Sequence, residues 1–314
     1  MNHNQARNIV LYSFIGDALS LGPHWIYRQS EIARRVGDVR GYVDPLSNYH
    51  PGKKAGDFTH YGDQTLALLR SVATAKRFEI QAFARVWRSF WEDPATISYQ
   101  DGATRATLQN LERGTLPQNS ASGSNDIAGA ARIAPLFLLQ WESTDALLSA
   151  AREQTSFTHG DEAVIESAEF FARLALRVGD GEPVPEALKS VAEMNHWQAI
   201  PQEWFEAAVR SSSSGKSTEN SAAEHGLSCH IPDAFPVVCD LLLRYPDDPV
   251  TALTKNAQAG GDAAARGMIL GLIYGARSEA AALPEEWFSG LTARDEIEQL
   301  MTRLSSETVL KDEG

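Results

Sequence analysis

The sequence is poor in cysteine, in basic residues and in long apolar runs, and each shortage excludes a class of protein. Its 314 residues include two cysteines, too few for the disulfide framework of a small secreted protein. Lys and Arg together number 28 against 41 Asp and Glu, which gives a net charge of −13. Because nucleic-acid binding depends on clustered basic side chains, we expect no nucleic-acid partner.

Membrane and secretory features are also missing. No apolar run approaches the roughly 20 residues that a membrane span needs, and the polar start from Met1 to Gln5 lacks the charged-then-apolar order of a secretory signal. We therefore expect no membrane partner and a cytoplasmic location. Cys229 and Cys239 are predicted to be buried thiols rather than a disulfide.

Apolar residues recur at helical spacing along most of the chain, whereas strand-like alternation is nearly absent. One face of a predicted helix carries Phe83, Val86, Trp87, Phe90 and Trp91, at positions i, i+3, i+4, i+7 and i+8. The sequence therefore predicts an all-α fold with one domain over residues 1–314. Its composition predicts a flexible loop at 211–222, where four serines precede a glycine.

Three glycines mark one predicted helix as unusual. Gly267, Gly271 and Gly275 stand four positions apart inside an apolar run. A glycine inside a helix costs up to about 1 kcal/mol relative to alanine, so three on one face predict close contact with another helix. We expect the helix over 263–276 to be among the most buried.

Two acidic residues, Asp63 and Asp262, each follow a glycine and stand just before a predicted helix. A carboxylate at this position can cap the helix. Alternatively, Asp63 and the Thr65 hydroxyl supply hard oxygen ligands of the kind that Mg²⁺ prefers. Asp262 is followed four residues later by Arg266, with which it can form a structural ion pair. Both interpretations stay open from these residues alone.

Three further segments are candidates for ligand binding. The small residues at 120–126 can present backbone N–H groups to a phosphate, although such loops are also ordinary connectors. His159 can contact a ribose or act as a hydrogen-bonded structural residue. Trp25 can line a pocket by stacking, or belong to the core.

Taken together and in this order, these segments resemble the ADP-ribosylglycohydrolase superfamily, which includes the dinitrogenase-reductase-activating glycohydrolases. The matching pieces are Gly16-Asp17-Ala18-Leu19, Gly62-Asp63-Gln64-Thr65, Ser124-Asn125-Asp126 with Ala131-Arg132-Ile133-Ala134-Pro135, Thr158-His159, and Gly260-Gly261-Asp262. The resemblance covers about residues 8–277. It implies a compact all-α fold with a binuclear Mg²⁺ site at the base of an ADP-ribose cleft, where an N- or O-glycosidic bond at the anomeric carbon of the ribose is cleaved.

The sequence departs from the family pattern at three places, two of them in the metal motifs. Gln64 stands at the second acid of the family motif Thr-Asp-Asp-Thr, and Ala264 at the second acid of Asp-x-Asp. His24 and Trp25 occupy a region in which many active members carry a glutamate. This pair makes the chain more similar to the branch of the jellyfish J1-crystallins and selenoprotein J. With two of four carboxylates missing, we expect one Mg²⁺ ion at most, bound weakly, or none.

The resemblance implies a hydrolase of an ADP-ribosyl or related ribosyl compound, either small or protein-linked. Asp63, Thr65 and Asp262 would hold the metal, with Asp63 and Asp262 close together as the catalytic residues. The residues that would bind the substrate are Trp25, Gly123, Ser124, Asn125 and His159. The alternative is a non-catalytic ligand-binding relative, or a crystallin-like structural protein, that has lost the binuclear metal site.

Overall fold

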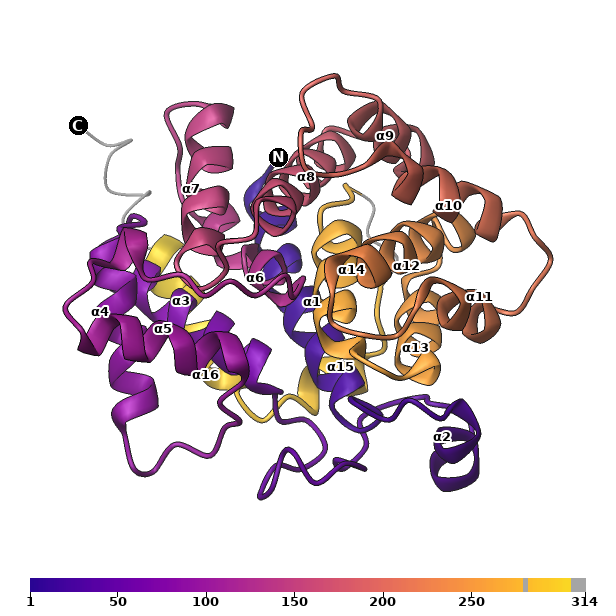
Figure 1. Cartoon of the computed structure of the whole chain (residues 1–314), viewed down its shortest axis with the longest axis horizontal. Coiled ribbons are helices and arrows are strands. Elements are labelled where there is room, and N and C mark those ends of the chain that lie inside the picture. The colour runs from indigo at the N-terminus through magenta and orange to yellow at the C-terminus, as the bar shows by residue number, and fades with distance from the viewer. Residues whose placement is uncertain (279–281, 306–314) are drawn as a thin grey trace.

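Helices make up all the regular secondary structure in the computed structural model, which describes residues 1–278 and 282–305 (Figure 1). This confirms the predicted all-α fold. The α-helices are α1 (His3–Leu21), α2 (Gln29–Val36), α3 (His60–Ala75), α4 (Ile80–Glu92), α5 (Gly102–Glu112), α6 (Ala128–Ala131), α7 (Thr144–Ser156), α8 (Glu162–Gly179), α9 (Val184–Ala192), α10 (Gln202–Ser212), α11 (Thr218–His225), α12 (Ile231–Arg244), α13 (Pro249–Ala259), α14 (Ala263–Gly275), α15 (Glu285–Ser289) and α16 (Arg294–Ser305). Two short 3₁₀ helices are η1 (Pro117–Asn119) and η2 (Ala134–Leu138).

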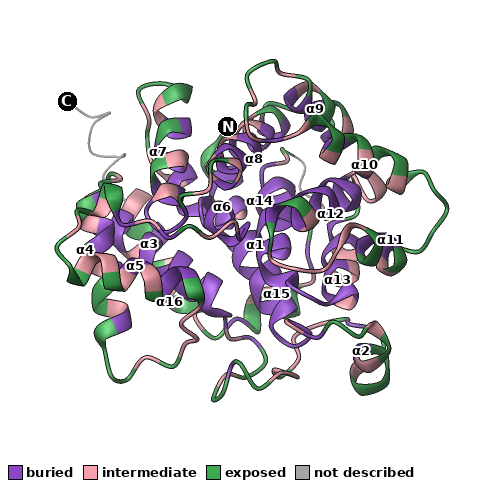
Figure 2. Ribbon diagram, in the orientation of Figure 1, coloured by how far each residue is buried: buried purple, intermediate pink, exposed green. Residues whose placement is uncertain are grey.

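Helices α1 and α14 lie side by side at the centre of the molecule (Figure 1). Every residue of α14 is buried, and α1 is buried over most of its length. A helix that is apolar on all sides is typical of the interior of a larger protein. The prediction that the glycine-rich helix is among the most buried is therefore confirmed (Figure 2).

The glycines of α14 allow its backbone to touch the backbone of α1. A methyl group on Gly271 would overlap the carbonyl of Tyr12, and one on Gly275 would overlap Asn8. Gly267 and Gly16 face each other in the same way, so that neither position has room for a side chain. The predicted close helix–helix contact is thus present, and its partner is α1.

The remaining helices surround this central pair. Helices α6, α8, α12 and α13 contact α14, whereas α3, α13 and η2 contact α1. Helix α10 packs against α12, α7 against α8, and α16 against α3 as an outer shell. Figure 2 shows that exposed residues gather on the outer helices, while the two central helices are buried.

Two local predictions have different outcomes. Phe83, Trp87 and Trp91 are buried on one face of α4, as their spacing predicted. The predicted extent of the loop, 211–222, was wrong, because α10 continues to Ser212 and α11 begins at Thr218. The hydroxyl of Ser217 accepts a hydrogen bond from the backbone N–H of Asn220, so serine here caps a helix rather than prolonging a loop.

Both cysteines have free thiols, with Cys239 buried and Cys229 half-buried. The prediction of thiols rather than a disulfide is confirmed. Among the described helices, none combines the length and apolar character that crossing a membrane requires.

We expect Gly271→Ala to lower the free energy of unfolding by roughly 1–3 kcal/mol, because the added methyl group forces the two central helices apart. Urea denaturation measures the change. Gly102→Ala is the matched control, since a methyl group at the start of α5 meets no atom within 4 Å. Its effect should stay below about 1 kcal/mol. Equal destabilisation by both substitutions would contradict this account of the contact.

Candidate functional site

Backbone hydrogen bonds join the turn after α1, the turn before α14 and the loop before α12. The N–H of Trp25 donates to Gly261 O (2.7 Å), and the N–H of Gly261 donates to Ile26 O (2.9 Å). The N–H of Asp262 donates to Leu227 O (2.8 Å). Gly261 has a φ of 63°, and a methyl group there would overlap the Leu227 carbonyl. The turn therefore requires glycine.

The segment before α6 completes this framework. The N–H of Ile127 donates to Cys229 O (3.0 Å), and the N–H of Ser122 donates to Thr158 O (3.0 Å). The segment thus lies between two loops that are distant in the sequence. This arrangement brings the Asp126 carboxyl next to the turn that carries Asp262.

The Tyr61 hydroxyl lies between two buried carboxyl groups. Its oxygen is 3.0 Å from Asp126 Oδ2 and 2.9 Å from Asp262 Oδ2. The indole N–H of Trp25 donates to the same Asp262 oxygen (3.1 Å). A tyrosine hydroxyl has one proton, so it can donate to only one of the two carboxyl groups. Both contacts are hydrogen bonds only when one carboxyl group is itself protonated.

Electrostatics place this proton on Asp126. Burial raises the pKa of Asp126 well above its usual range, and the nearby charge of Asp262 raises it further. Burial also raises the pKa of Asp262, but the Trp25 hydrogen bond, the Arg266 charge and the Tyr61 hydroxyl oppose that rise. Asp126 therefore donates to the Tyr61 oxygen, and Tyr61 donates to the Asp262 carboxylate. The site contains a carboxylic acid beside a carboxylate.

Trp25 has a strained backbone. Its φ of 62° lies in the left-handed region, which costs a bulky residue about 1–3 kcal/mol. The bonds to Gly261 and Asp262 hold it there, and the His24 ring stacks on the indole with ring centroids 4.6 Å apart. Tyr99 meets the indole edge-on at 5.0 Å. Strain of this kind clusters at ligand-binding sites, because it fixes a side chain in advance of binding.

Trp25, Tyr61, Tyr99 and Asp126 border a cavity of about 460 Å³. Three of the predicted substrate-binding residues, Trp25, Gly123 and Ser124, lie in its wall. Sequence reasoning assigned no role to the other chemically important wall residues, which are Tyr61, Tyr99, Asp101, Asp126 and Cys229. Tyr61 directly precedes the motif that begins at Gly62, and Asp126 is the last residue of the motif Ser124-Asn125-Asp126. Their positions at these motifs were the available signal.

Asp63 and Thr65 make other contacts. Both Asp63 carboxylate oxygens accept hydrogen bonds from Lys53 Nζ, at 2.9 and 2.8 Å. The cap of α3 is Thr59, so the interpretation of Asp63 as a helix cap was wrong. The Thr65 hydroxyl donates to Tyr61 O (2.9 Å) within its own helix. Thr65 thus binds the backbone of Tyr61, whose side-chain hydroxyl binds Asp262. Among the described hydrogen bonds, Asp63 shares no partner with Asp262.

Asn125 and His159 lie outside the cavity wall. Asn125 Oδ1 is 2.5 Å from His230 Nδ1. His159 is buried with its Nδ1 2.8 Å from the Thr158 hydroxyl, and it packs so closely on Gly129 that a methyl group there would overlap the imidazole. Burial, together with the charge of Arg132, lowers the pKa of His159 to about 3. These contacts support the structural interpretation of His159.

Asp262 neither caps α14 nor forms an ion pair with Arg266, the two structural roles that its position in the sequence suggested. Asp262 occupies the N-cap position of α14, but its side chain accepts no hydrogen bond from the helix backbone. Among the described ion pairs, none joins Asp262 to Arg266. Arg266 instead donates to Gly260 O and to Asn256 Oδ1 (3.0 Å), which secures the turn before α14. The Asp262 carboxylate is thus free to bind Tyr61 and Trp25.

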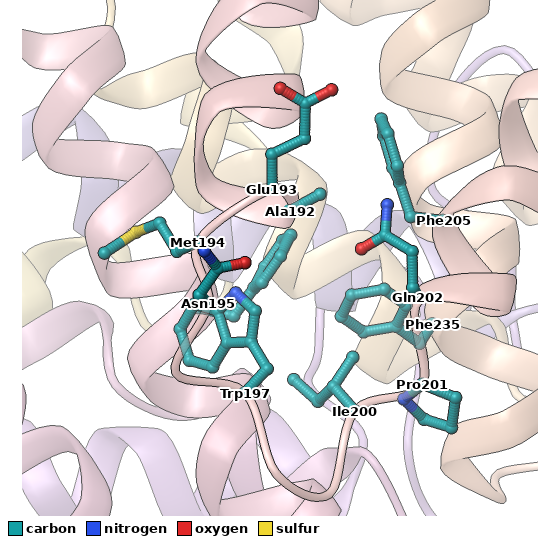
Figure 3. A pocket seen from close by; sticks show the side chains of 11 residues that line it. Ala192, Glu193, Met194, Asn195, Trp197, Ile200, Pro201, Gln202, Phe205 and Phe235 are labelled. Carbon is teal, nitrogen blue, oxygen red and sulfur yellow. The ribbon is translucent and has the colours of Figure 1, made fainter.

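A second cavity, of about 470 Å³, lies beside α8, α9, α10 and α12 (Figure 3). Its wall combines aromatic residues, among them Phe170, Trp197 and Phe205, with polar residues such as Asn195 and Gln202. The lining includes one carboxylate, Glu193, which is exposed. Because this wall offers no buried acid or base, the chemistry is better assigned to the cavity beside Asp126.

We expect Asp126→Asn to stabilise the protein at pH 8 but not near pH 4. The unfolded state gains free energy by ionising Asp126 above pH 4, whereas the folded state, with its raised pKa, does not. Asparagine cannot ionise, so it removes this stabilisation of the unfolded state. Its amide can still donate to the Tyr61 oxygen. The gain in the free energy of unfolding should therefore grow as the pH rises from 4 to 8. Urea denaturation at both pH values measures the free energy of unfolding, and the exposed Asp38→Asn is the control. An equal pH dependence of stability in the wild type and in Asp126→Asn would refute the prediction.

Comparisons with known proteins agree with this architecture. The family pattern described as ADP-ribosylglycohydrolase matches residues 2–313. An uncharacterized protein of Archaeoglobus fulgidus is 26% identical over 95% of each chain, and Crystallin J1A of Tripedalia cystophora is 22% identical over 96% of each. A solved structure named ADP-ribosylglycohydrolase-related protein complex is 23% identical, with a TM-score of 0.74 over 97% of this chain and 98% of that one. The chain belongs to the ADP-ribosylglycohydrolase family.

Proposed function

We propose that the protein hydrolyses an ADP-ribosyl or related ribosyl compound, cleaving an N- or O-glycosidic bond at the anomeric carbon of the ribose. Membership of the family supports a glycohydrolase-like function. The observation that carries the proposal is the Tyr61 hydroxyl bridging Asp126 and Asp262 at the cavity. Glycosidic cleavage uses a carboxylic acid beside a carboxylate, with the two environments setting different pKa values.

Asp126 is the group that reaches the substrate, because it lies in the cavity wall. It gives its proton to the leaving nitrogen or oxygen as the bond to the anomeric carbon breaks. Water then adds to the anomeric carbon, and the proton it releases returns to Asp126. Asp262 is fully buried behind the wall and acts through Tyr61, keeping the proton on Asp126 and offering negative charge to the developing cation.

Two contacts support Asp126 rather than Asp63 as the partner of Asp262. Asp126 and Asp262 share the Tyr61 hydroxyl, whereas both oxygens of Asp63 are bound by the Lys53 ammonium. Burial raises the pKa of Asp63, but the charge and hydrogen bonds of Lys53 oppose this rise. In this scheme, Asp63 anchors Lys53 and the loop before α3.

The cavity also indicates which part of a substrate it suits. Its volume is in the range of small-molecule sites. Trp25 and Tyr99 offer aromatic surface, and the backbone around Gly123 and Ser124 offers polar groups. Among the described residues of the wall there is no Lys or Arg, and Asp101 adds negative charge. A ribosyl group with a neutral or cationic leaving group therefore suits the wall better than an anionic leaving group does.

The residues at the family's metal motifs do not fit a binuclear Mg²⁺ centre. The Gln64 side-chain oxygen already accepts from Trp87 Nε1 (2.8 Å) and from Arg132, and Ala264 has no ligand atom. Lys53 neutralises Asp63. Ligand atoms of Asp126, Cys229 and Asp262 do lie within 4.8 Å of one another. These three residues could together hold one divalent ion at most. We therefore derive no step through Mg²⁺.

The second candidate is a ligand-binding or structural protein without catalysis. The similarity to Crystallin J1A over nearly the whole chain favours it. This candidate predicts that ribosyl compounds bind in the cavity without turnover. Hydrolysis assays and equilibrium binding on the same compounds distinguish the two.

We expect Asp126→Asn to lower kcat by roughly 10²–10⁴-fold, the contribution typical of a general acid. ADP-ribosyl-arginine and ribosyl compounds without the diphosphate are suitable substrates, with release of free ribose or ADP-ribose as the readout. Asp262→Asn should shift the alkaline limb of the rate to lower pH, because removal of the neighbouring charge lowers the pKa of Asp126. The exposed Asp38→Asn serves as control. Unchanged turnover in Asp126→Asn, with loss confined to Asp63→Asn, would rule out this assignment.

Calorimetric titration of the wild type should show no more than one weakly bound Mg²⁺ per chain. Lys53→Met frees the Asp63 carboxylate and should strengthen Mg²⁺ binding about tenfold, or by about 1.4 kcal/mol. Lys54→Met is the matched control: it removes a positive charge at the next position but leaves the Lys53–Asp63 pair in place. It should have little effect on Mg²⁺ affinity. Two tightly bound Mg²⁺ ions in the wild type would contradict the assignment of these residues.

A further inference from the structure

Three buried histidines gather behind the cavity wall, and the proposed hydrolysis does not use them. His24 follows α1, His50 belongs to the loop before α3, and His60 begins α3. Their exposed fractions are 0, 3 and 0%. One ring nitrogen of each lies within 4.8 Å of the others. Three separate chain segments thus converge on one set of nitrogen atoms.

The spacing of two of these rings suits a shared metal ion. His50 Nε2 lies 3.3 Å from His60 Nδ1. Nitrogen ligands of a tetrahedral Zn²⁺ with bonds of about 2.0–2.1 Å are about 3.4 Å apart. Imidazole nitrogen favours Zn²⁺, Cu²⁺ or Ni²⁺, whereas Mg²⁺ prefers oxygen. The group therefore differs in chemistry from the carboxyl groups at the cavity.

A carboxylate stands behind His60, as in many metal sites. His60 Nε2 lies 3.4 Å from Asp101 Oδ2. Asp101 is itself fixed, because its side chain caps α5 by accepting from the backbone N–H of Thr104 (2.6 Å). His60 Nε2 makes no hydrogen bond in the described structure, but the nearby Asp101 carboxylate favours a proton on this atom. The lone pair of His60 Nδ1 then faces His50. Such carboxylate–histidine pairs orient metal ligands.

Polar atoms of this group lack partners in the described structure. His24 Nε2, His50 Nδ1 and His60 Nε2 are buried without a hydrogen bond, and an unpaired buried polar atom is destabilising. His24 Nδ1 accepts one long bond from Ala264 N (3.4 Å). Metal binding at Nε2 requires the ring proton to move to Nδ1, so this bond is lost when the metal binds.

We propose that His24, His50 and His60 bind one transition-metal ion, with Zn²⁺ the best match, at a site separate from Asp126 and Asp262. Three protein ligands leave a fourth position for water or another small ligand. The ion would tie the loop that carries His50 and Lys53 to the turn after α1. It would thereby hold Lys53 against Asp63 and support the strained Trp25 beside His24.

The test uses the full-length protein, freed of metal with a chelator and dialysed against Co²⁺ or Zn²⁺. We expect one ion per chain, with the intense visible absorption of tetrahedral Co²⁺ bound by nitrogen. His50→Ala should weaken binding by at least 100-fold, and Asp101→Asn by about 10-fold to 100-fold, the usual effect of losing the group behind a ligand. The exposed His196→Ala controls for surface histidines and should bind as the wild type does.

Asp262→Asn separates this site from the group formed by Asp126, Cys229 and Asp262. Binding by the histidines predicts an unchanged affinity in this variant, and no sulfur-to-cobalt charge-transfer band in the wild type. Absence of binding, retention of binding in His50→Ala, or loss of binding in Asp262→Asn would overturn the proposal. If His50→Ala fails to fold by circular dichroism, X-ray absorption of the zinc-loaded wild type decides: three imidazole nitrogens support the site, and an oxygen-only shell refutes it.

Discussion

The antiparallel contact between α1 and α14 positions the whole candidate site. The two backbones touch because glycines face each other, as at Gly16 and Gly267. Antiparallel packing brings the end of α1 next to the start of α14, where the turns that carry Trp25 and Asp262 exchange hydrogen bonds. A bulkier residue in the contact would displace both turns together. The geometry of the acid pair thus depends on close packing some distance from the cavity.

A second constraint is the number of ionisable groups in the interior. Burial raises the pKa of Asp17 to about 6, although Thr59 donates to both of its carboxylate oxygens and thereby fixes the start of α3. Arg132 is buried and donates to Gln64 and to the Thr158 hydroxyl. Gln64 therefore links Arg132 and Trp87 at the position where the resemblance to the family implies a metal carboxylate. The neutral amide replaces charge with a directional hydrogen-bond network.

The sequence predicted the fold well because helical periodicity and the glycine spacing are local signals. It also identified Trp25, Gly123 and Ser124 as residues of the cavity wall. It did not reveal that Lys53 neutralises Asp63, since an exposed-looking lysine in a loop gives no sign of its partner. Asp126 was quoted within a motif without a role, because its raised pKa arises from burial and from Asp262, which is 136 positions away (262 − 126). Such properties depend on tertiary contacts rather than on neighbouring residues.

The pairing of α1 with α14 also has a consequence for how the chain folds. Gly16 and Gly267 are 251 positions apart (267 − 16), so α1 is synthesised long before its partner exists. During translation, the apolar surface of α1 therefore stays exposed until α14 has been synthesised. Contacts of such long range slow folding and leave intermediates prone to aggregation. The central helix pair, which is buried in the native protein, is thus exposed in the nascent one.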